Sequence, residues 1–250
     1  MNEQLHFADS GEAADLAAFL GRLVHYDRAA AVRLQAGGGA VAVFGRPPSF
    51  DVLAIRTVRL AAPVAAPLDV TVSAGELLES VDEAAAAATV PRAVTGPPWT
   101  GVLPPRGGWR QLAGLPGPEA MGRAVAAAVA EFRARDEALP PQHRTRSERD
   151  RIGREIWSRC LGDTELPLRA VHAAHSLGFL RPVRAIVAAA ASAASAASAA
   201  SAASAAPAGP EPLALLAAGS WLRLRTPYGS VATRRPGATG GLGAFQVRPV

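Results

Sequence analysis

Lysine is absent from this chain of 250 residues, so all 26 of its basic residues are arginine. Asparagine and isoleucine are also rare, whereas alanine, glycine, proline and arginine, which have GC-rich codons, are abundant. A GC-rich gene therefore explains much of the composition. It also weakens the inference from a net charge of +5 to an acidic partner, because codon usage alone can supply the arginines.

Cysteine occurs once, at Cys160, which excludes an intramolecular disulfide and a zinc site with two thiolates. Its position at the end of an arginine-rich helical segment is not the helix N-terminus at which reactive thiols are activated. We therefore expect Cys160 to be a structural side chain that behaves as a small hydrophobe.

Long runs of large apolar residues are missing as well. Residues 1–12 contain neither the basic region nor the apolar stretch of a signal peptide. The longest apolar stretch, near residues 185–206, consists mostly of alanine and serine, which are too weakly apolar for a transmembrane helix. These absences predict a cytoplasmic protein with no membrane partner.

Aromatic residues make up only 5% of the chain, although hydrophobic residues reach 49% and charged residues 19%. A disordered chain would contain fewer apolar and more charged residues, so this balance predicts a packed core. Small side chains each bury little surface, and such a core needs many contacts rather than a few large anchors.

The first ninety residues follow the pattern of helix-flanked antiparallel strands. Asp9 or Ser10 can cap a first helix, and Glu12 completes a capping box after Asp9. Apolar and polar residues then alternate, and short turns separate the successive runs, which predicts an antiparallel meander. The predicted elements are a helix over 10–26, strands over 32–35, 41–43, 50–60 and 68–72, and a helix over 73–88.

A proline-rich segment precedes the helical part of the chain. Proline fixes φ and lacks an amide donor, so residues 89–117 are predicted to form an ordered extended loop, which Trp99 and Trp109 hold against the core. Helical spacing and proline or glycine boundaries follow further along. The predicted elements are helices over 118–139, 147–161 and 166–177 and strands over 179–186, 221–226 and 230–235.

These elements predict an α+β fold, in which a helix-flanked antiparallel meander precedes a helical segment and a C-terminal β-hairpin in winged-helix-like order. We divide the chain into five parts. The meander occupies 1–90, the Pro/Trp-rich loop 91–117, and the helical segment with one strand 118–187. A low-complexity Ala/Ser/Pro insert occupies 188–218, and a basic hairpin and tail occupy 219–250. The Ser-Ala-Ala repeats predict that most of the insert, residues 190–216, is dispensable.

Three segments carry a resemblance to a known family. They are Leu-Pro-Pro-Arg-Gly-Gly-Trp at 103–109, residues 166–180 from Leu-Pro-Leu-Arg to Gly-Phe-Leu, and residues 221–231 from Trp-Leu-Arg-Leu-Arg to Gly-Ser-Val. Together they are similar to an uncharacterised family of actinobacterial proteins, over most of the chain outside the insert. The resemblance implies no activity, cofactor or catalytic residue.

Candidate catalytic and metal-binding groups are few. His172 and His175 share one helix face, as a metal pair would, but Ala173 and Ala174 lie between them where metalloenzymes carry a general base. The glycines at 37–39 lack the lysine and the helix of a phosphate-binding loop, and no Gly-x-Ser-x-Gly motif occurs. We therefore predict a protein that is not an enzyme and holds no cofactor or metal.

Charge is distributed unevenly along the chain. Residues 1–143 carry 12 arginines against 15 acidic residues, a formal charge of −3, whereas residues 144–250 carry 14 arginines against 6, a charge of +8. In a winged-helix arrangement the third helix and the hairpin would both face nucleic acid. The candidate contacts are Arg169, with His172 and Ser176 beside it, and Arg223, Arg225, Arg234 and Arg235 on the hairpin.

Three function classes are open on these grounds, and an enzyme is the weakest of them because no acid/base, nucleophile or metal constellation is visible. The leading hypothesis is an intracellular binding or regulatory protein whose partner is another protein. The alternative is a nucleic-acid-binding protein that uses the arginine-rich C-terminal half, where charge supports contact with phosphates rather than sequence specificity. The sequence leaves the oligomeric state open.

Overall fold

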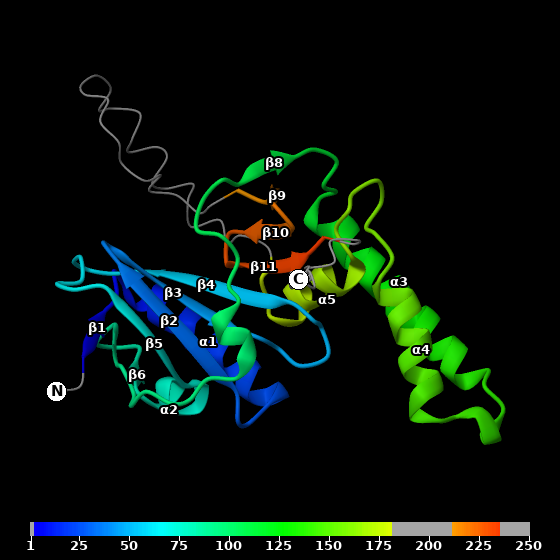
Figure 1. Cartoon of the computed structure of the whole chain (residues 1–250), viewed down its shortest axis with the longest axis horizontal. Coiled ribbons are helices and arrows are strands. Elements are labelled where there is room, and N and C mark those ends of the chain that lie inside the picture. Colours follow the sequence, from blue (N-terminus) through cyan, green and yellow to red (C-terminus); the bar gives the residue numbers. More distant parts are fainter. Residues whose placement is uncertain (1–2, 182–211, 236–250) are drawn as a thin grey trace, which may run out of the picture.

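The computed structural model describes residues 3–181 and 212–235 (Figure 1). An antiparallel eight-stranded sheet forms the centre of the molecule, in the order β5-β2-β3-β4-β11-β10-β9-β8. A smaller sheet has the order β1-β7-β6. The strands are β1 (Gln4–His6), β2 (Ala31–Gly37), β3 (Ala40–Gly45), β4 (Leu53–Arg59), β5 (Leu68–Ser73), β6 (Val81–Asp82), β7 (Ala87–Thr89), β8 (Arg110–Leu112), β9 (Ala214–Ala218), β10 (Trp221–Thr226) and β11 (Gly229–Arg234).

The large sheet joins the two halves of the chain. Strand β4 of the N-terminal half pairs with β11 of the C-terminal half, with Leu53 opposite Ala232 and Ile55 opposite Ser230. One hydrophobic core extends from the first helix to the C-terminal hairpin. The halves therefore fold around a common core and share a single sheet.

Alternation along the strands gives this sheet two different faces. Leu222 and Leu224 of β10 are fully buried in the main core, while Trp221 and Arg223 point to the opposite side. Helices α1 (Ser10–Tyr26) and α5 (Leu168–Ser176) pack on the first face, which we call the helix face. Among the described residues no α-helix packs on the other face, where a part of the 91–117 segment lies; we call it the open face.

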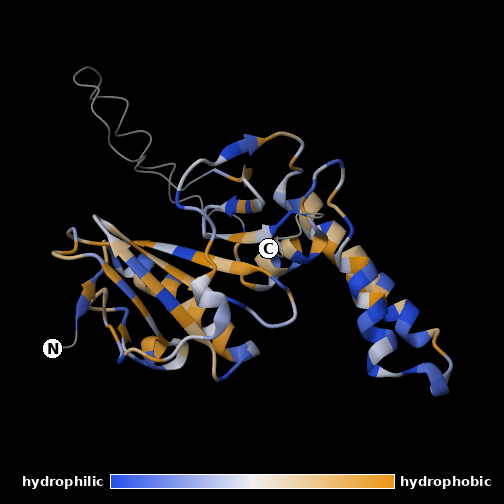
Figure 2. Cartoon of the chain, in the orientation of Figure 1, coloured by the Kyte–Doolittle hydropathy of each residue, from blue (hydrophilic) through white to orange (hydrophobic). Residues whose placement is uncertain are grey.

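The predicted helices are present, with local caps at their starts. Asp9 accepts a hydrogen bond from the amide of Glu12, which confirms the capping box at the start of α1. Ser73 caps α2 (Ala74–Glu79) in the same way. Helices α3 (Pro118–Glu137) and α4 (Arg146–Trp157) form a hairpin that projects from the sheet, and its outer part is strongly hydrophilic (Figures 1 and 2). Short 3-10 turns occupy η1 (Pro98–Gly101) and η2 (Pro141–His143).

The helix predicted over 73–88 is shorter than expected. It ends at Glu79, because the hydroxyl of Ser80 donates to the carbonyls of Leu77 and Thr89 and turns the chain back. The following alanines then form β7, which pairs with β1. Tertiary pairing with a distant strand thus overrides the helix propensity of the alanine run.

The C-terminal half differs from the prediction in two places. Residues 179–181 form a turn instead of the start of a strand, and residues 182–186 lie outside the described residues. The predicted insert over 188–218 is too long at its C-terminal end, because Ala214–Ala218 form the fully buried strand β9. Residues 214–216 of the stretch predicted to be dispensable thus belong to this buried strand, while residues 190–211 of that prediction lie outside the described part of the chain.

The α+β prediction with antiparallel strands and a C-terminal hairpin is confirmed. The hairpin β10–β11 does not stand free as a wing, because β4 pairs with one of its edges and β9 with the other. Among the described helices, none is long and apolar enough to cross a membrane.

Gly229 shows how closely the two halves approach at this seam. Its φ is 148°, and a Cβ at this position would lie 2.7 Å from the ring of Phe179 and 2.9 Å from the carbonyl oxygen of Ile55. We expect Gly229→Ala to lower the free energy of unfolding by about 2–4 kcal/mol, through both backbone strain and this collision. Denaturant unfolding measures the loss.

Gly219 is the matched control, since its φ is 53° but a Cβ added there would have open space around it, with no contact within 4 Å. Gly219→Ala is expected to lose only the backbone contribution, about 1–2 kcal/mol. Equal losses in the two variants would contradict the close approach at Gly229.

Candidate binding face

The open face carries a second, smaller apolar cluster. Buried residues of four neighbouring strands form it, and part of the proline-rich segment packs on top. The strand residues are Phe44, Leu53, Ile55, Trp221 and Ala232, and the covering residues include Trp99, Leu103 and Trp109. The two tryptophans expected to hold the loop against the core therefore do so, although they contact this second cluster instead of the main core.

Two hollows lie side by side on the open face. The larger, of about 700 Å³, lies between the start of β2, the β3–β4 loop and residues 94–99. The smaller, of about 170 Å³, lies between Trp99, Val102, Trp221 and Arg234. Both are lined by Arg46, Asp51 and Trp99, and we call the two hollows together the trough.

The β3–β4 loop forms one wall of the trough in an unusual conformation. Ser49 has a φ of 70° and Asp51 a φ of 50°, which is the left-handed region that non-glycine residues seldom occupy. Between them, Phe50 turns inward and is only 9% exposed. The buried ring thus anchors the loop, and its two neighbours line the trough.

Guanidinium groups surround the trough. Arg46 forms an ion pair of 3.0 Å with Asp51, and Arg234 lies 4.1 Å from the ring centroid of Trp221. Further along the face, Arg33 forms a bidentate pair with Asp69 and also donates to the carbonyl of Thr100. The hydrogen bond from Arg33 lowers the pKa of the Asp69 carboxyl below its usual value, so Asp69 stays ionised.

The five arginines predicted to contact nucleic acid do not share one surface. Arg223, Arg225 and Arg234 alternate with core residues of the hairpin and lie on the open face. Arg235 pairs with Glu165 at 2.8 Å. Arg169 belongs to α5, which packs on the helix face. The structure therefore separates Arg169 from Arg223, Arg225 and Arg234 by the thickness of the sheet, unlike the helix and wing of a winged-helix protein.

The two histidines also differ in surroundings. His172 stacks on Trp157 at a centroid distance of 4.4 Å and meets Phe50 edge-on at 5.1 Å, whereas His175 is exposed. Burial, and to a smaller degree the nearby charge of His175, lowers the pKa of His172. In the described part of the chain, no group of three or more His, Cys, Asp or Glu residues is arranged to hold a metal ion.

Cys160 is exposed, which does not fit the expectation of a structural side chain that behaves as a small hydrophobe. The residue forms a single bridge opposite Pro167 just after α4, which leaves its side chain at the surface.

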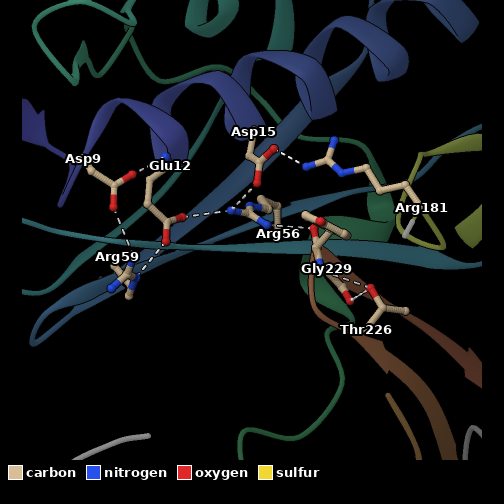
Figure 3. A network of polar contacts seen from close by, with 9 residues as sticks. Asp9, Glu12, Asp15, Arg56, Arg59, Arg181, Thr226 and Gly229 are labelled. Atoms are coloured by element: carbon tan, nitrogen blue, oxygen red, sulfur yellow. Dashed lines mark hydrogen bonds and ion pairs between the residues drawn. The ribbon is translucent and has the colours of Figure 1, made fainter. Parts of the chain in front are cut away.

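A charged network that the sequence analysis did not identify lies behind the site, on the helix face (Figure 3). Arg56 of β4 is only 6% exposed and reaches Glu12 at 2.8 Å and Asp15 at 3.3 Å, both on α1. Its other terminal nitrogen donates to the carbonyl of Tyr228 at 2.9 Å. Arg181, which follows α5, donates to Asp15.

This network connects the halves of the chain at the point where their strands pair. Arg59 extends it to Glu12 and Asp9 at the exposed end of β4. The sequence does carry a signal for its centre, since Arg56 occupies an inward position between Ala54 and Val58 in an otherwise apolar alternation. A charged residue at such a position needs buried partners, which the acidic side of α1 supplies.

Two family models match the chain, and the boundary between them lies in the proline-rich segment. A family model described as a domain of unknown function (DUF8010) matches residues 1–101, and one described as a domain of unknown function (DUF8185) matches residues 104–238. No curated protein and no solved structure matches the chain. The resemblance to an uncharacterised family is confirmed, whereas its actinobacterial origin stays a prediction.

Proposed function

The chain belongs to the DUF8185 domain family, and we propose that it is a non-enzymatic binding protein whose trough receives an acidic, extended segment of a partner protein. The observation that carries this proposal is the trough itself, where two arginines and two tryptophans meet on a sheet face that no described α-helix covers. Tryptophan and arginine are the side chains most enriched among the dominant contacts of protein interfaces.

Charge favours an acidic ligand at this position. Arg46 is exposed at the junction of the two hollows, and Arg234 lies across the smaller one. Planar guanidinium groups bind carboxylates through paired hydrogen bonds, which are stronger than neutral ones. Arg46 already holds one carboxylate, that of Asp51, so a ligand carboxylate can take the same geometry by exchange.

The apolar part of the trough suits one large side chain of the ligand. The smaller hollow has Trp99 and Trp221 in its walls and Val102, which is 50% exposed, at its rim. An exposed valine beside two tryptophans is apolar surface that a partner can cover. A segment with acidic residues on either side of one apolar residue therefore complements the arginines of the trough and the apolar walls of the smaller hollow.

A protein segment fits the trough better than a nucleic-acid strand. Asp27 and Asp51 line the larger hollow, and their carboxylates would repel a continuous row of phosphates, whereas a peptide of alternating acidic and apolar residues can place its separated carboxylates at Arg46 and Arg234. Arg169 and Arg235 cannot join the hairpin arginines on one surface. One observation supports nucleic acid as the second candidate. Arg223, Arg225 and Arg234 lie on the same open face, where Arg223 is close to Trp109 and Arg234 is close to Trp221.

Fluorescence anisotropy with three labelled probes tests the proposal on the full chain. The probes are a peptide of alternating glutamate and leucine, its glutamine counterpart, and an oligothymidine strand. We expect binding of the acidic peptide alone, and a loss of at least about tenfold in the Arg46→Gln/Arg234→Gln double variant, because two charge-assisted contacts are removed.

Arg123→Gln is the control for loss of an arginine elsewhere, since this residue lies on α3 and its side chain is 74% exposed. Its affinity for the acidic peptide should equal that of the unaltered chain. Absence of peptide binding, or equal losses in the double variant and this control, would overturn the proposal. Tight binding of the oligothymidine that the double variant weakens would support nucleic acid instead.

A further inference from the structure

A row of aromatic rings connects the helical hairpin to the wall of the trough. Trp157, the last residue of α4, stacks on His172 of α5 with an interplanar angle of 23°. His172 in turn meets Phe50 of the β3–β4 loop, and Phe50 meets Tyr26 at the end of α1 at 5.8 Å. The row therefore runs from the 104–238 half of the chain to the 1–101 half.

Phe50 is the member of this row that determines the shape of the loop. Ser49 and Asp51 on either side of it occupy left-handed conformations, and each costs free energy that the surrounding packing must supply. Ser49, Asp51 and their neighbours Arg46 and Pro48 line the trough. The position of the buried Phe50 ring therefore determines where these groups lie. His172 contacts one side of this ring.

We propose that His172 is a proton-sensitive latch on the trough: its neutral ring holds Phe50 and the β3–β4 loop in the binding conformation, and its protonation releases them. This inference rests on the proposed function in that the trough is taken as the partner site. It adds a regulatory input from α4 and α5, which contribute no residue to the lining of either hollow.

The latch follows from where the imidazole lies. A protonated ring is most stable where water surrounds it, and His172 is half-buried between Trp157 and Phe50. It gains water when the least tightly held neighbour moves away. The loop that carries Phe50 is strained and its flanking residues are exposed, whereas Trp157 is fixed at the end of a helix.

Each element that forms the row carries charged or titratable groups within a few residues of its ring. They include His175 and Arg169 on α5, Arg154, Glu155 and Arg159 on or just after α4, Arg46 and Asp51 on the loop, and His25 and Asp27 at the end of α1. Arg46 and Asp51 pair with each other, and His175 acts on His172 as a like charge when protonated. Burial is the main influence on the protonation of His172, and the charge of His175 is the second.

The sign of the pH dependence is determined by the lowered pKa of His172. Neutral His172 contributes fully to the stability of the native loop conformation above the ordinary histidine pKa of 6.5. This contribution is lost as the pH falls through the lowered pKa of His172 in the folded chain. By thermodynamic linkage, a partner that binds only when the β3–β4 loop is in the binding conformation must lower the pKa of His172 further when it binds.

Nuclear magnetic resonance of the full chain tests the latch without any ligand. We expect the backbone amides of Ser49, Phe50 and Asp51 to shift with pH along the titration curve of the His172 ring. In His172→Phe, which keeps a ring but cannot take up a proton, these shifts should vanish. His175→Gln is the matched control, and it should leave them in place with a small rise in the midpoint. Loop amides that ignore the His172 titration would overturn the inference, whatever the trough binds.

Peptide binding then connects the latch to function. Between pH of about 7.5 and about 5.5 the unaltered chain should lose about fivefold in affinity for the acidic glutamate–leucine peptide, and His172→Phe should lose none. An equal loss in both would overturn the coupling. Titrating loop amides without any peptide binding would retain the latch and overturn the proposed function, so the two failures are distinguishable.

Discussion

Arg56→Met is expected to lower the free energy of unfolding by about 3–5 kcal/mol, one of the two largest losses predicted for a single substitution in this chain. Arg56 is only 6% exposed, and its guanidinium neutralises Glu12 and Asp15 while donating to the carbonyl of Tyr228. Methionine fills a similar volume but leaves two carboxylates and a carbonyl without this partner. Guanidinium chloride unfolding followed by circular dichroism measures the loss.

The neighbouring arginine supplies the matched control. Arg59 pairs with the same Glu12 at 2.8 Å, but its side chain is 60% exposed, and solvent screens the interaction. Arg59→Met should therefore cost no more than about 1 kcal/mol. A loss for Arg56→Met as small as that of Arg59→Met would mean that water reaches the network and that it does not stabilise the junction of the halves.

Removing the acidic partners together with the arginine separates two explanations for such a loss. If the unpaired carboxylates cause it, the triple variant Glu12→Gln/Asp15→Asn/Arg56→Met should recover part of the stability, because neutral amides are less costly to bury than charges. If lost packing causes it, the triple variant should be no more stable than Arg56→Met alone. The expected result is partial recovery.

Much of the local structure could be predicted from short-range signals. The capping box at Asp9 and Glu12 and the one at Ser73 and Glu76 mark the starts of α1 and α2, and Pro118 marks the start of α3. These interactions lie within a few residues of each other, so a single sequence contains all of the information. Strands β2 to β5 follow from alternation for the same reason.

Elements that depend on distant partners could not be predicted in this way. Strands β1, β7 and β8 have three residues each, and β7 lies in an alanine run that is typical of a helix. Each of these strands forms because its backbone pairs with another strand, as the backbone of β8 does with that of β9. No local pattern in three residues reports the presence of such a partner.

Most residues of the candidate site could not be predicted from local patterns for the same reason. The order of helices and hairpin suggested that Arg169 and Arg223 would face one ligand, but the hairpin pairs with β4 and becomes the interior of a sheet with α5 behind it. The trough is assembled from loops and strand ends that are far apart in sequence. The sequence pointed to Trp99, as a large aromatic residue in a proline-rich segment, and to Arg234, through the basic charge of the C-terminal half.

Trp221→Ala is expected to cost about 3–5 kcal/mol of stability, comparable with the loss at Arg56. Its indole is 9% exposed and packs in the apolar cluster of the open face with Phe44 and Leu53. Arg234 covers the ring at 4.1 Å, and its guanidinium loses this contact as well. The truncation leaves a void beneath the smaller hollow that the rigid neighbouring strands cannot close.

Trp109 is the comparison within the same cluster. It is half-buried, and its indole nitrogen donates to the carbonyl of Pro105, so Trp109→Ala should lose roughly 1–2 kcal/mol. Both losses should exceed that of Arg225→Gln, for which a surface substitution predicts about 0.5 kcal/mol. Equal denaturation midpoints for the two tryptophan variants would show that the open face has no rigid apolar floor at Trp221, and the trough would then lack the fixed wall that a bound side chain requires.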